Sequence, residues 1–168
     1  MAPERRGTVP GASRAPSGPA ARPADAPGAA DPLAAAAPRL VALAEAEPDR
    51  EVCGLLVDGP AGVEAWPMPN RAADPARAFA LGPEDLLGAL RRLEGEGRAL
   101  LGVFHSHPSG GADLSALDLD GALVDGAPLL GGVAQVVVAL RAGRACTVRA
   151  HRWADGRYAG VDLWTPVP

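Results

Sequence analysis

The stretch ALLGVFHSHPSGGADLSALD, residues 99–118, decides the fold because it joins an apolar strand to a helix through one short loop. The run over 99–104 is typical of a strand buried in the middle of a sheet. It leads directly into His105. Ser115 suits the start of a short helix, whose expected buried residues are Leu119, Ala122 and Leu123.

Helical and strand patterns alternate on both sides of this stretch. Leu40, Leu43 and Ala44 recur at helical spacing and predict a helix over 38–47, which Pro48 ends. A second helix begins at Pro83 and stops between Gly95 and Gly97. Further strands are expected over residues 51–59, 63–68, 77–81, 133–140, 145–153 and 158–163, with a hairpin between the first two and turns at Ala142-Gly143 and Asp155-Gly156. The predicted fold class is therefore α/β, a mixed β-sheet flanked by helices.

The length of 168 residues allows one ordinary domain and a tail. Residues 1–31 are rich in Pro, Ala, Gly and Arg and contain no Leu, Ile, Phe or Trp, so they cannot bury enough apolar surface to offset their ordering entropy. We therefore expect a disordered tail over 1–31 and a folded domain over 32–168. An organelle transit peptide is disfavoured, because prolines and acidic residues would interrupt an amphipathic helix.

Charge and cysteine content limit the partners and the compartment. The net charge is −4 and the isoelectric point is about 5.3, which disfavours nucleic acid as a partner. The five arginines between residues 141 and 157 are interpreted as solvated strand faces. The chain lacks an apolar run of about 18 residues, so no membrane partner is expected. Two distant cysteines indicate a reducing, cytoplasmic setting.

Metal-ligating residue types gather in the deciding stretch. His105 and His107 stand two apart at the end of the strand, so their side chains project to one face and can meet one ion. Asp118 lies one helical turn beyond Ser115 and can direct its carboxylate to the same point. Two imidazoles and one carboxylate form a three-donor set for zinc and leave a fourth position for a water whose pKa falls to about 7. Glu51, at the start of an apolar strand, is the candidate base that takes the proton from this water.

Each of these residues also has a purely structural interpretation. The histidines can be ordinary strand-end residues, and Glu51 alone is typical of a solvent-facing strand start. Ser115 and Asp118 have the spacing of a capping box, a role compatible with catalysis.

Three neighbouring polar residues receive no catalytic role. Cys53 is expected to be a small buried hydrophobe, and His151 a surface residue in a late strand. Ser106 lies between the two histidines and should point to the opposite face.

Taken together, Glu51, His105-Ser106-His107, Ser115 after seven residues and Asp118 after two more resemble the JAMM signature of the MPN-domain metalloproteases. The segments EVCGLLVDG, MPNRAADPARAFAL and GVFHSHPSG are also similar to the prokaryotic, stand-alone members, so the resemblance covers residues 33–163. Leu114 departs from the pattern, because relatives often have Pro before the serine. Long insertions near the site are not seen, which argues against recognition of linkage-specific ubiquitin chains.

The resemblance implies the MPN/JAMM fold, a three-layer architecture like that of cytidine deaminases. It implies one Zn²⁺ per chain held by His105, His107 and Asp118, with Glu51 as the base and Ser115 as the hydroxyl donor to the oxyanion. The implied reaction is hydrolysis of an amide by a peptidase or isopeptidase. Family precedent in bacteria favours a ubiquitin-like or sulfur-carrier protein with a Gly-Gly tail as the substrate.

Three other functions agree less well with these residues. A metal-free MPN-type scaffold that binds partners is disfavoured because all five site residues are present. A RadC-like protein of DNA repair is suggested by HPSG at 107–110, but that branch usually has Asn where this chain has Ser106 and usually carries a helical module. A cytidine deaminase is excluded because neither HxE nor PCxxC occurs. The oligomeric state and the leaving group stay open.

Overall fold

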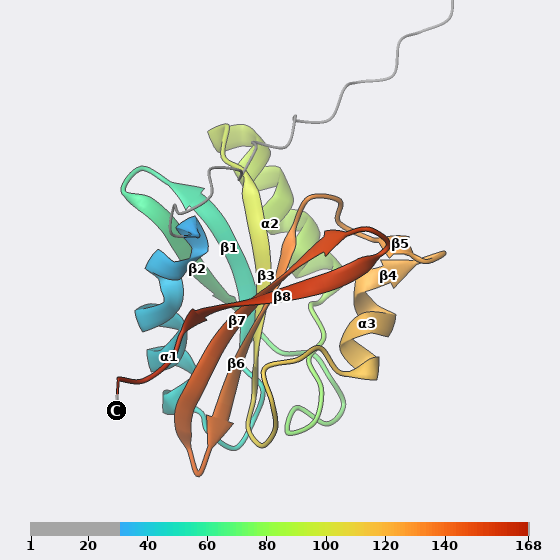
Figure 1. Ribbon diagram of the computed structural model, residues 1–168. Coiled ribbons are helices and arrows are strands. Elements are labelled where there is room, and N and C mark those ends of the chain that lie inside the picture. Colours follow the sequence, from blue (N-terminus) through green and yellow to red (C-terminus); the bar gives the residue numbers. More distant parts are fainter. Residues whose placement is uncertain (1–30, 168) are drawn as a thin grey trace, which may run out of the picture.

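The computed structural model describes residues 31–167, and these form a six-stranded sheet with helices on both faces (Figure 1). In chain order the elements are η1 (Pro32–Ala36), α1 (Ala37–Ala46), β1 (Cys53–Gly59), β2 (Gly62–Met68), α2 (Pro83–Glu96), β3 (Leu100–His107), α3 (Ala116–Ala122), β4 (Leu123–Val124), β5 (Ala127–Pro128), β6 (Ala134–Arg141), β7 (Arg144–Ala154) and β8 (Arg157–Trp164). The prediction of a mixed α/β sheet flanked by helices is confirmed.

The strand order is β2-β1-β3-β6-β7-β8, which places β3 near the middle of the sheet. All neighbours run antiparallel except β3 and β6, which are parallel. A parallel pair needs a long crossover, and here the segment that carries α3 supplies it. The end of β3 therefore opens into a loop and a helix instead of a tight hairpin.

Tight turns join the antiparallel strands of the second half. At Ala142-Gly143 and Asp155-Gly156 the first residue has φ 51° and the second about 75°, the left-handed pair that suits a two-residue hairpin. Both turns were predicted. A third turn of this kind, Asp125-Gly126, joins β4 and β5 in a small hairpin that was not predicted from the sequence.

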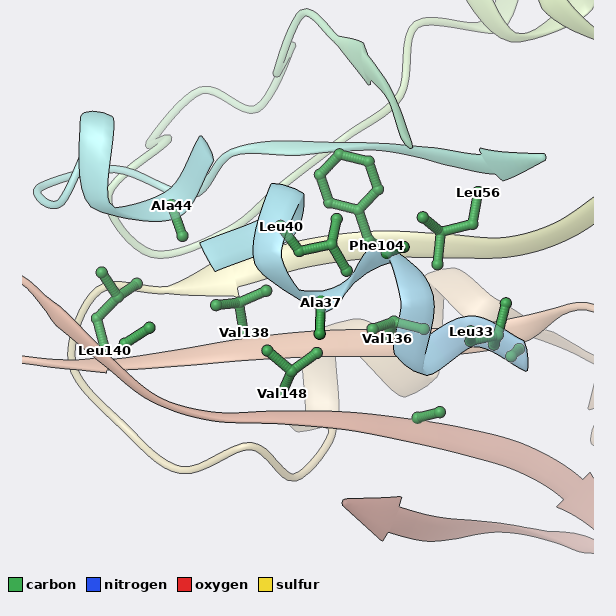
Figure 2. Close-up of a cluster of buried hydrophobic side chains, with 14 residues drawn as sticks. Leu33, Ala37, Leu40, Ala44, Leu56, Phe104, Val136, Val138, Leu140 and Val148 are labelled. Carbon is green, nitrogen blue, oxygen red and sulfur yellow. The ribbon is translucent and has the colours of Figure 1, made fainter. Parts of the chain in front are cut away.

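Helix α1 covers one face of the sheet. Leu40 and Ala44 of α1 are fully buried against Phe104 of β3 and Val138 of β6, and Figure 2 shows these side chains converging between the helix and the central strands. Full burial of a leucine side chain contributes roughly 1.5–3 kcal/mol. The pattern seen in 38–47 is thus the face that holds α1 on the sheet.

Asp31 fixes the start of the described chain. Its carboxylate accepts a hydrogen bond from the amide of Leu33 at 2.9 Å and pairs with Arg152 of β7 at 2.9 Å. The expected tail over 1–31 otherwise lies outside the described residues. Asp31, its last residue, caps the first helical turn of the domain.

Helix α2 packs on the opposite face, where Leu93 meets Leu55, Val57 and Val103. As predicted, Pro83 stands in its first turn, and Gly97 ends it with φ 65°. Helix α3 lies on the same face as α2. Its Leu119 lines a cavity of about 540 Å³ together with Arg149, His151 and Trp153, the residues of β7 whose side chains point to that face. No helix within residues 31–167 is long and apolar enough to cross a membrane.

Two local predictions were wrong. Residues 77–81, expected as a strand, form a loop in which Leu81 pairs with Asn70 through an isolated β-bridge. The Asn70 side chain satisfies the backbone of this loop, so a strand partner is not needed. Leu119 and Leu123 are half-buried instead of buried, because α3 is short and ends at Ala122 beside an open cavity.

Candidate metal centre

His105 and His107 are the last residues of one face of β3, and this face lies under α2 and α3. In the sheet His105 pairs with Cys53 of β1 and with Val137 of β6. The side chain of His105 is fully buried, and that of His107 is 12% exposed. Ser106 points to the opposite face, where its hydroxyl accepts a hydrogen bond from the amide of Val52 at 3.0 Å. The strand alternation inferred from the sequence is therefore confirmed.

Ser115 and Asp118 form the capping box that begins α3. The Ser115 hydroxyl accepts a hydrogen bond from the Asp118 amide at 3.1 Å, and the Ser115 amide donates to the Asp118 carboxylate at 2.6 Å. These two bonds prevent the Asp118 carboxylate from turning outward. They leave the hydroxyl hydrogen of Ser115 free to be donated.

Three donors, two from β3 and one from α3, meet at one point. The Nε2 atoms of His105 and His107 lie 3.0 Å apart, and each lies 3.3 Å from one carboxylate oxygen of Asp118. Two tetrahedral ligands that each bind zinc at about 2.0–2.1 Å are separated by roughly 3.3 Å. Imidazole nitrogen and carboxylate oxygen are both zinc donors. The residues present therefore fit a zinc ion and supply three of its usual four ligands.

The electrostatics of the cluster favour ligation. Burial lowers the pKa of His105 below its ordinary value, so its ring is neutral near pH 7. Burial acts in the same direction on His107, but the Asp118 carboxylate and the Gly111 carbonyl outweigh it and raise the pKa of His107. Burial raises the pKa of Asp118, but hydrogen bonds from both histidines and from Ser115 hold it well below its usual range. A metal ion would thus meet an ionised carboxylate and would displace at most one proton, from His107.

The two histidines are oriented by different contacts. Nδ1 of His107 lies 2.8 Å from the carbonyl oxygen of Gly111, an acceptor that keeps a proton on Nδ1, so a metal would displace the proton from Nε2 and bind there. Nδ1 of His105 is buried and has no hydrogen-bond partner in the part of the chain that the structure describes. Instead, the ring of Phe79 stacks on His105 with a centroid distance of 4.3 Å and an interplanar angle of 17°.

Glu51 lies just before β1 and beside the cluster. Strand β1 pairs with β3 in a register that sets Cys53 opposite His105. If this antiparallel register is continued by two residues, Glu51 lies opposite His107. The residue is 5% exposed, and burial raises the pKa of its carboxyl from 4.5 to about 7, opposed in part by the positive field of His107. One of its oxygens, Oε2, lacks a hydrogen-bond partner within residues 31–167. Glu51 is thus a buried carboxyl whose pKa lies near neutral pH, and it does not face solvent.

The structure therefore brings all five residues named from the sequence into one site. Cys53 is buried as predicted, and burial raises the pKa of its thiol to about 11, so the thiol stays neutral.

His151 was wrongly expected at the surface. It is 5% exposed, and its Nε2 lies 2.7 Å from the carbonyl oxygen of Ala112 in the loop that leads to Ser115. Arg149, two residues earlier on β7, holds the same loop through Asp113 at 2.6 Å. The sequence carries no local signal for these contacts, because β7 and the loop are 36 or more residues apart.

Sequence reasoning also assigned no role to Asn70. Its side-chain amide donates to the carbonyl oxygens of Glu51 and Ala78, both at 2.9 Å, and its carbonyl accepts from the amides of Ala72 and Ala80. An asparagine directly after Pro69, close to a strand end, is the available signal, since its side chain both donates and accepts.

Comparisons with known proteins agree with this geometry. The family model described as prokaryotic homologs of the JAB domain matches residues 33–153. The chain is 37% identical over 78 residues to a desampylase of Haloferax volcanii. The matching segment covers 45% of this chain and 56% of the desampylase. It is 45% identical over 53 residues to a probable TtuB-protein conjugate cleaving protease of Thermus thermophilus, 32% of this chain and 36% of that protein. The matches thus span about half and about a third of these relatives.

A solved structure shares the fold. The solution structure of protein DSY2949 from Desulfitobacterium hafniense matches with a TM-score of 0.58 and 21% identity. The match covers 74% of this chain and 84% of that one. This likeness concerns the arrangement of helices and strands alone.

Proposed function

The chain belongs to the family of prokaryotic homologs of the JAB domain, and from this premise we propose that it is a zinc-dependent peptidase or isopeptidase. Its substrate would be an amide bond that follows the C-terminal Gly-Gly of a ubiquitin-like or sulfur-carrier protein. A reducing cytoplasm is the proposed setting, and neither nucleic acid nor a membrane is a proposed partner.

One observation carries the proposal: a buried carboxyl with a pKa of about 7 lies beside three converging zinc donors. A structural zinc site would have four protein ligands and no need for a base. Here His105, His107 and Asp118 supply three donors, and Glu51 is placed to exchange protons next to them. This division of roles is typical of a site that activates water.

The residues would share the reaction as follows. Zinc, when bound, would lower the pKa of a coordinated water and polarise the substrate carbonyl. Glu51 would accept the proton of the attacking water and pass it to the leaving amine, so that a carboxylic acid and an amine result. The Ser115 hydroxyl would donate a hydrogen bond to the carbonyl oxygen as negative charge develops there. Its role as an acceptor from the Asp118 amide fixes the position of this donor.

The substrate class rests on the names of the relatives. One relative is named a desampylase and the other a probable TtuB-protein conjugate cleaving protease, and we take a protein conjugate as the substrate class of this chain as well. Glycine has no side chain, so a Gly-Gly tail could pass through a site too narrow for other residues. A single residue type at these two positions would then decide which proteins are cleaved.

The first experiment measures zinc without any substrate. We expect about one zinc per purified chain and loss of most of it in His107→Ala, because two donors bind zinc far more weakly than three. The Glu51→Gln variant, which keeps every ligand, should retain the zinc. A wild-type protein that binds no zinc after reconstitution would refute the proposal and favour a metal-free scaffold.

The second experiment tests the substrate. A ubiquitin-like carrier joined through its Gly-Gly tail to the ε-amine of a lysine is compared with the same conjugate ending in Ala-Ala. We expect cleavage of the first alone, abolished by Glu51→Gln and by chelation of zinc. Equal cleavage of both conjugates would contradict the proposed role of the two glycines.

A further inference from the structure

The two histidines of the metal centre differ in what holds their rings. A ligating histidine ordinarily donates its second ring N–H to an oxygen, which fixes the ring plane and the tautomer. His107 has this contact through Gly111. His105 has no such partner among residues 31–167, although its Nδ1 is buried. Something else must therefore keep its ring in the plane that directs Nε2 toward Asp118.

Phe79 provides that contact. Its ring lies nearly parallel to the imidazole of His105, at 4.3 Å between centroids and 17° between planes. Stacked aromatic pairs contribute about 0.5–1.5 kcal/mol beyond the area they bury. A ring lying on one flat side of an imidazole opposes rotation about the Cβ–Cγ bond. It does so without consuming a hydrogen bond.

The position of Phe79 is itself fixed by the loop that carries it. Asn70 closes this loop with hydrogen bonds to the backbone of Ala72, Ala78 and Ala80. Ala78 and Ala80 are the residues directly before and after Phe79. The same side chain holds the carbonyl oxygen of Glu51. The amide of Glu51 donates to the carbonyl oxygen of Pro75 in this loop at 2.6 Å. One loop therefore contacts both the proposed base and a proposed metal ligand.

We propose that Phe79, held in place by Asn70, is a positioning residue that orients His105 for metal binding. It replaces the hydrogen bond that Gly111 provides to His107. The inference rests on the proposed function only for the identity of the metal, because the contact itself is seen without one.

Zinc affinity, measured by competition with a chelating dye, is the test. Loss of a contact that orients a ligand weakens metal binding by roughly 10–100-fold, and we expect a loss in this range for Phe79→Ala. Phe79→Tyr keeps the ring and should bind within about threefold of wild type on the same scale. Leu90→Ala is the matched control, because Leu90 packs in the same hydrophobic cluster as Phe79 but does not stack on His105.

A second readout needs neither metal nor substrate. In the zinc-free protein, the stacked ring should move the imidazole proton signals of His105 upfield in NMR spectra, and Phe79→Ala should remove this shift. The signals of His107 serve as the internal reference. If Phe79→Ala does not fold, Phe79→Leu removes the ring and keeps most of the apolar volume.

The outcomes separate the two proposals. A wild type without zinc refutes the proposed metallopeptidase. A wild type that binds zinc, with Phe79→Ala binding equally tightly or no more weakly than Leu90→Ala, refutes the positioning role alone. Unchanged His105 signals in the zinc-free variant also refute it.

Discussion

Replacement of Glu51 by Gln should make the zinc-free protein more stable at pH 8 while it abolishes catalysis. Glu51 is 5% exposed, and its Oε2 has no partner in the described chain. The ionised carboxylate is thus desolvated without full compensation, which is why burial raises its pKa from 4.5 to about 7. Glutamine has the same shape and no charge to bury.

The size and sign follow from linkage. Each unit of pKa shift corresponds to about 1.4 kcal/mol, so the rise corresponds to about 3 kcal/mol. Between pH 4.5 and about 7 the folded protein keeps a proton on Glu51 that the unfolded chain has lost, so the free energy of unfolding falls as pH rises through this window. Glu51→Gln removes this contribution. Its stability advantage over wild type should therefore grow by up to about 3 kcal/mol between pH 4.5 and pH 8.

Urea unfolding in EDTA, followed by the fluorescence of the three tryptophans, measures this difference at each pH. The histidines titrate in both proteins, so the difference between the two stability curves isolates Glu51. Equal m-values would show that the same surface is exposed on unfolding. A difference that stays constant with pH would refute the reasoning, because Glu51 would then ionise as it does in the unfolded chain.

Three further substitutions probe the contacts around the site. Asn70→Asp keeps the acceptor but loses the donor to the Glu51 carbonyl, and should lower the free energy of unfolding by about 2 kcal/mol, measured by thermal unfolding. An unchanged melting temperature would contradict the role of Asn70 in holding the loop against Glu51. His151→Phe leaves the Ala112 carbonyl without its donor and should cost about 1–2 kcal/mol in urea unfolding, whereas a neutral effect would place that carbonyl in water. Ser115→Ala removes the cap of α3 and should cost about 1 kcal/mol. Its kcat should fall roughly 100-fold with zinc content unchanged; loss of stability alone would exclude the proposed oxyanion contact.

Elements with strong local signals were predicted well. The turns at Ala142-Gly143 and Asp155-Gly156 depend on residues that accept left-handed backbone angles, and both lie where expected. Helix α2 begins at Pro83 and ends at Gly97 for equally local reasons. By contrast, residues 77–81 have the composition of a strand but form a loop, because one distant side chain, Asn70, satisfies their backbone.

The sequence by itself determined how the three potential metal ligands are placed within each element. His105 and His107 share a face because strands alternate, and Asp118 turns back to Ser115 because a helix start needs a cap. Only the tertiary structure decided which residues support these donors. Glu51, Phe79 and His151 reach the site through strand register and loop packing across tens of residues, and the burial that raises the pKa of Glu51 exists only after the sheet has formed. Such contacts depend on distances between elements, which no local spacing encodes.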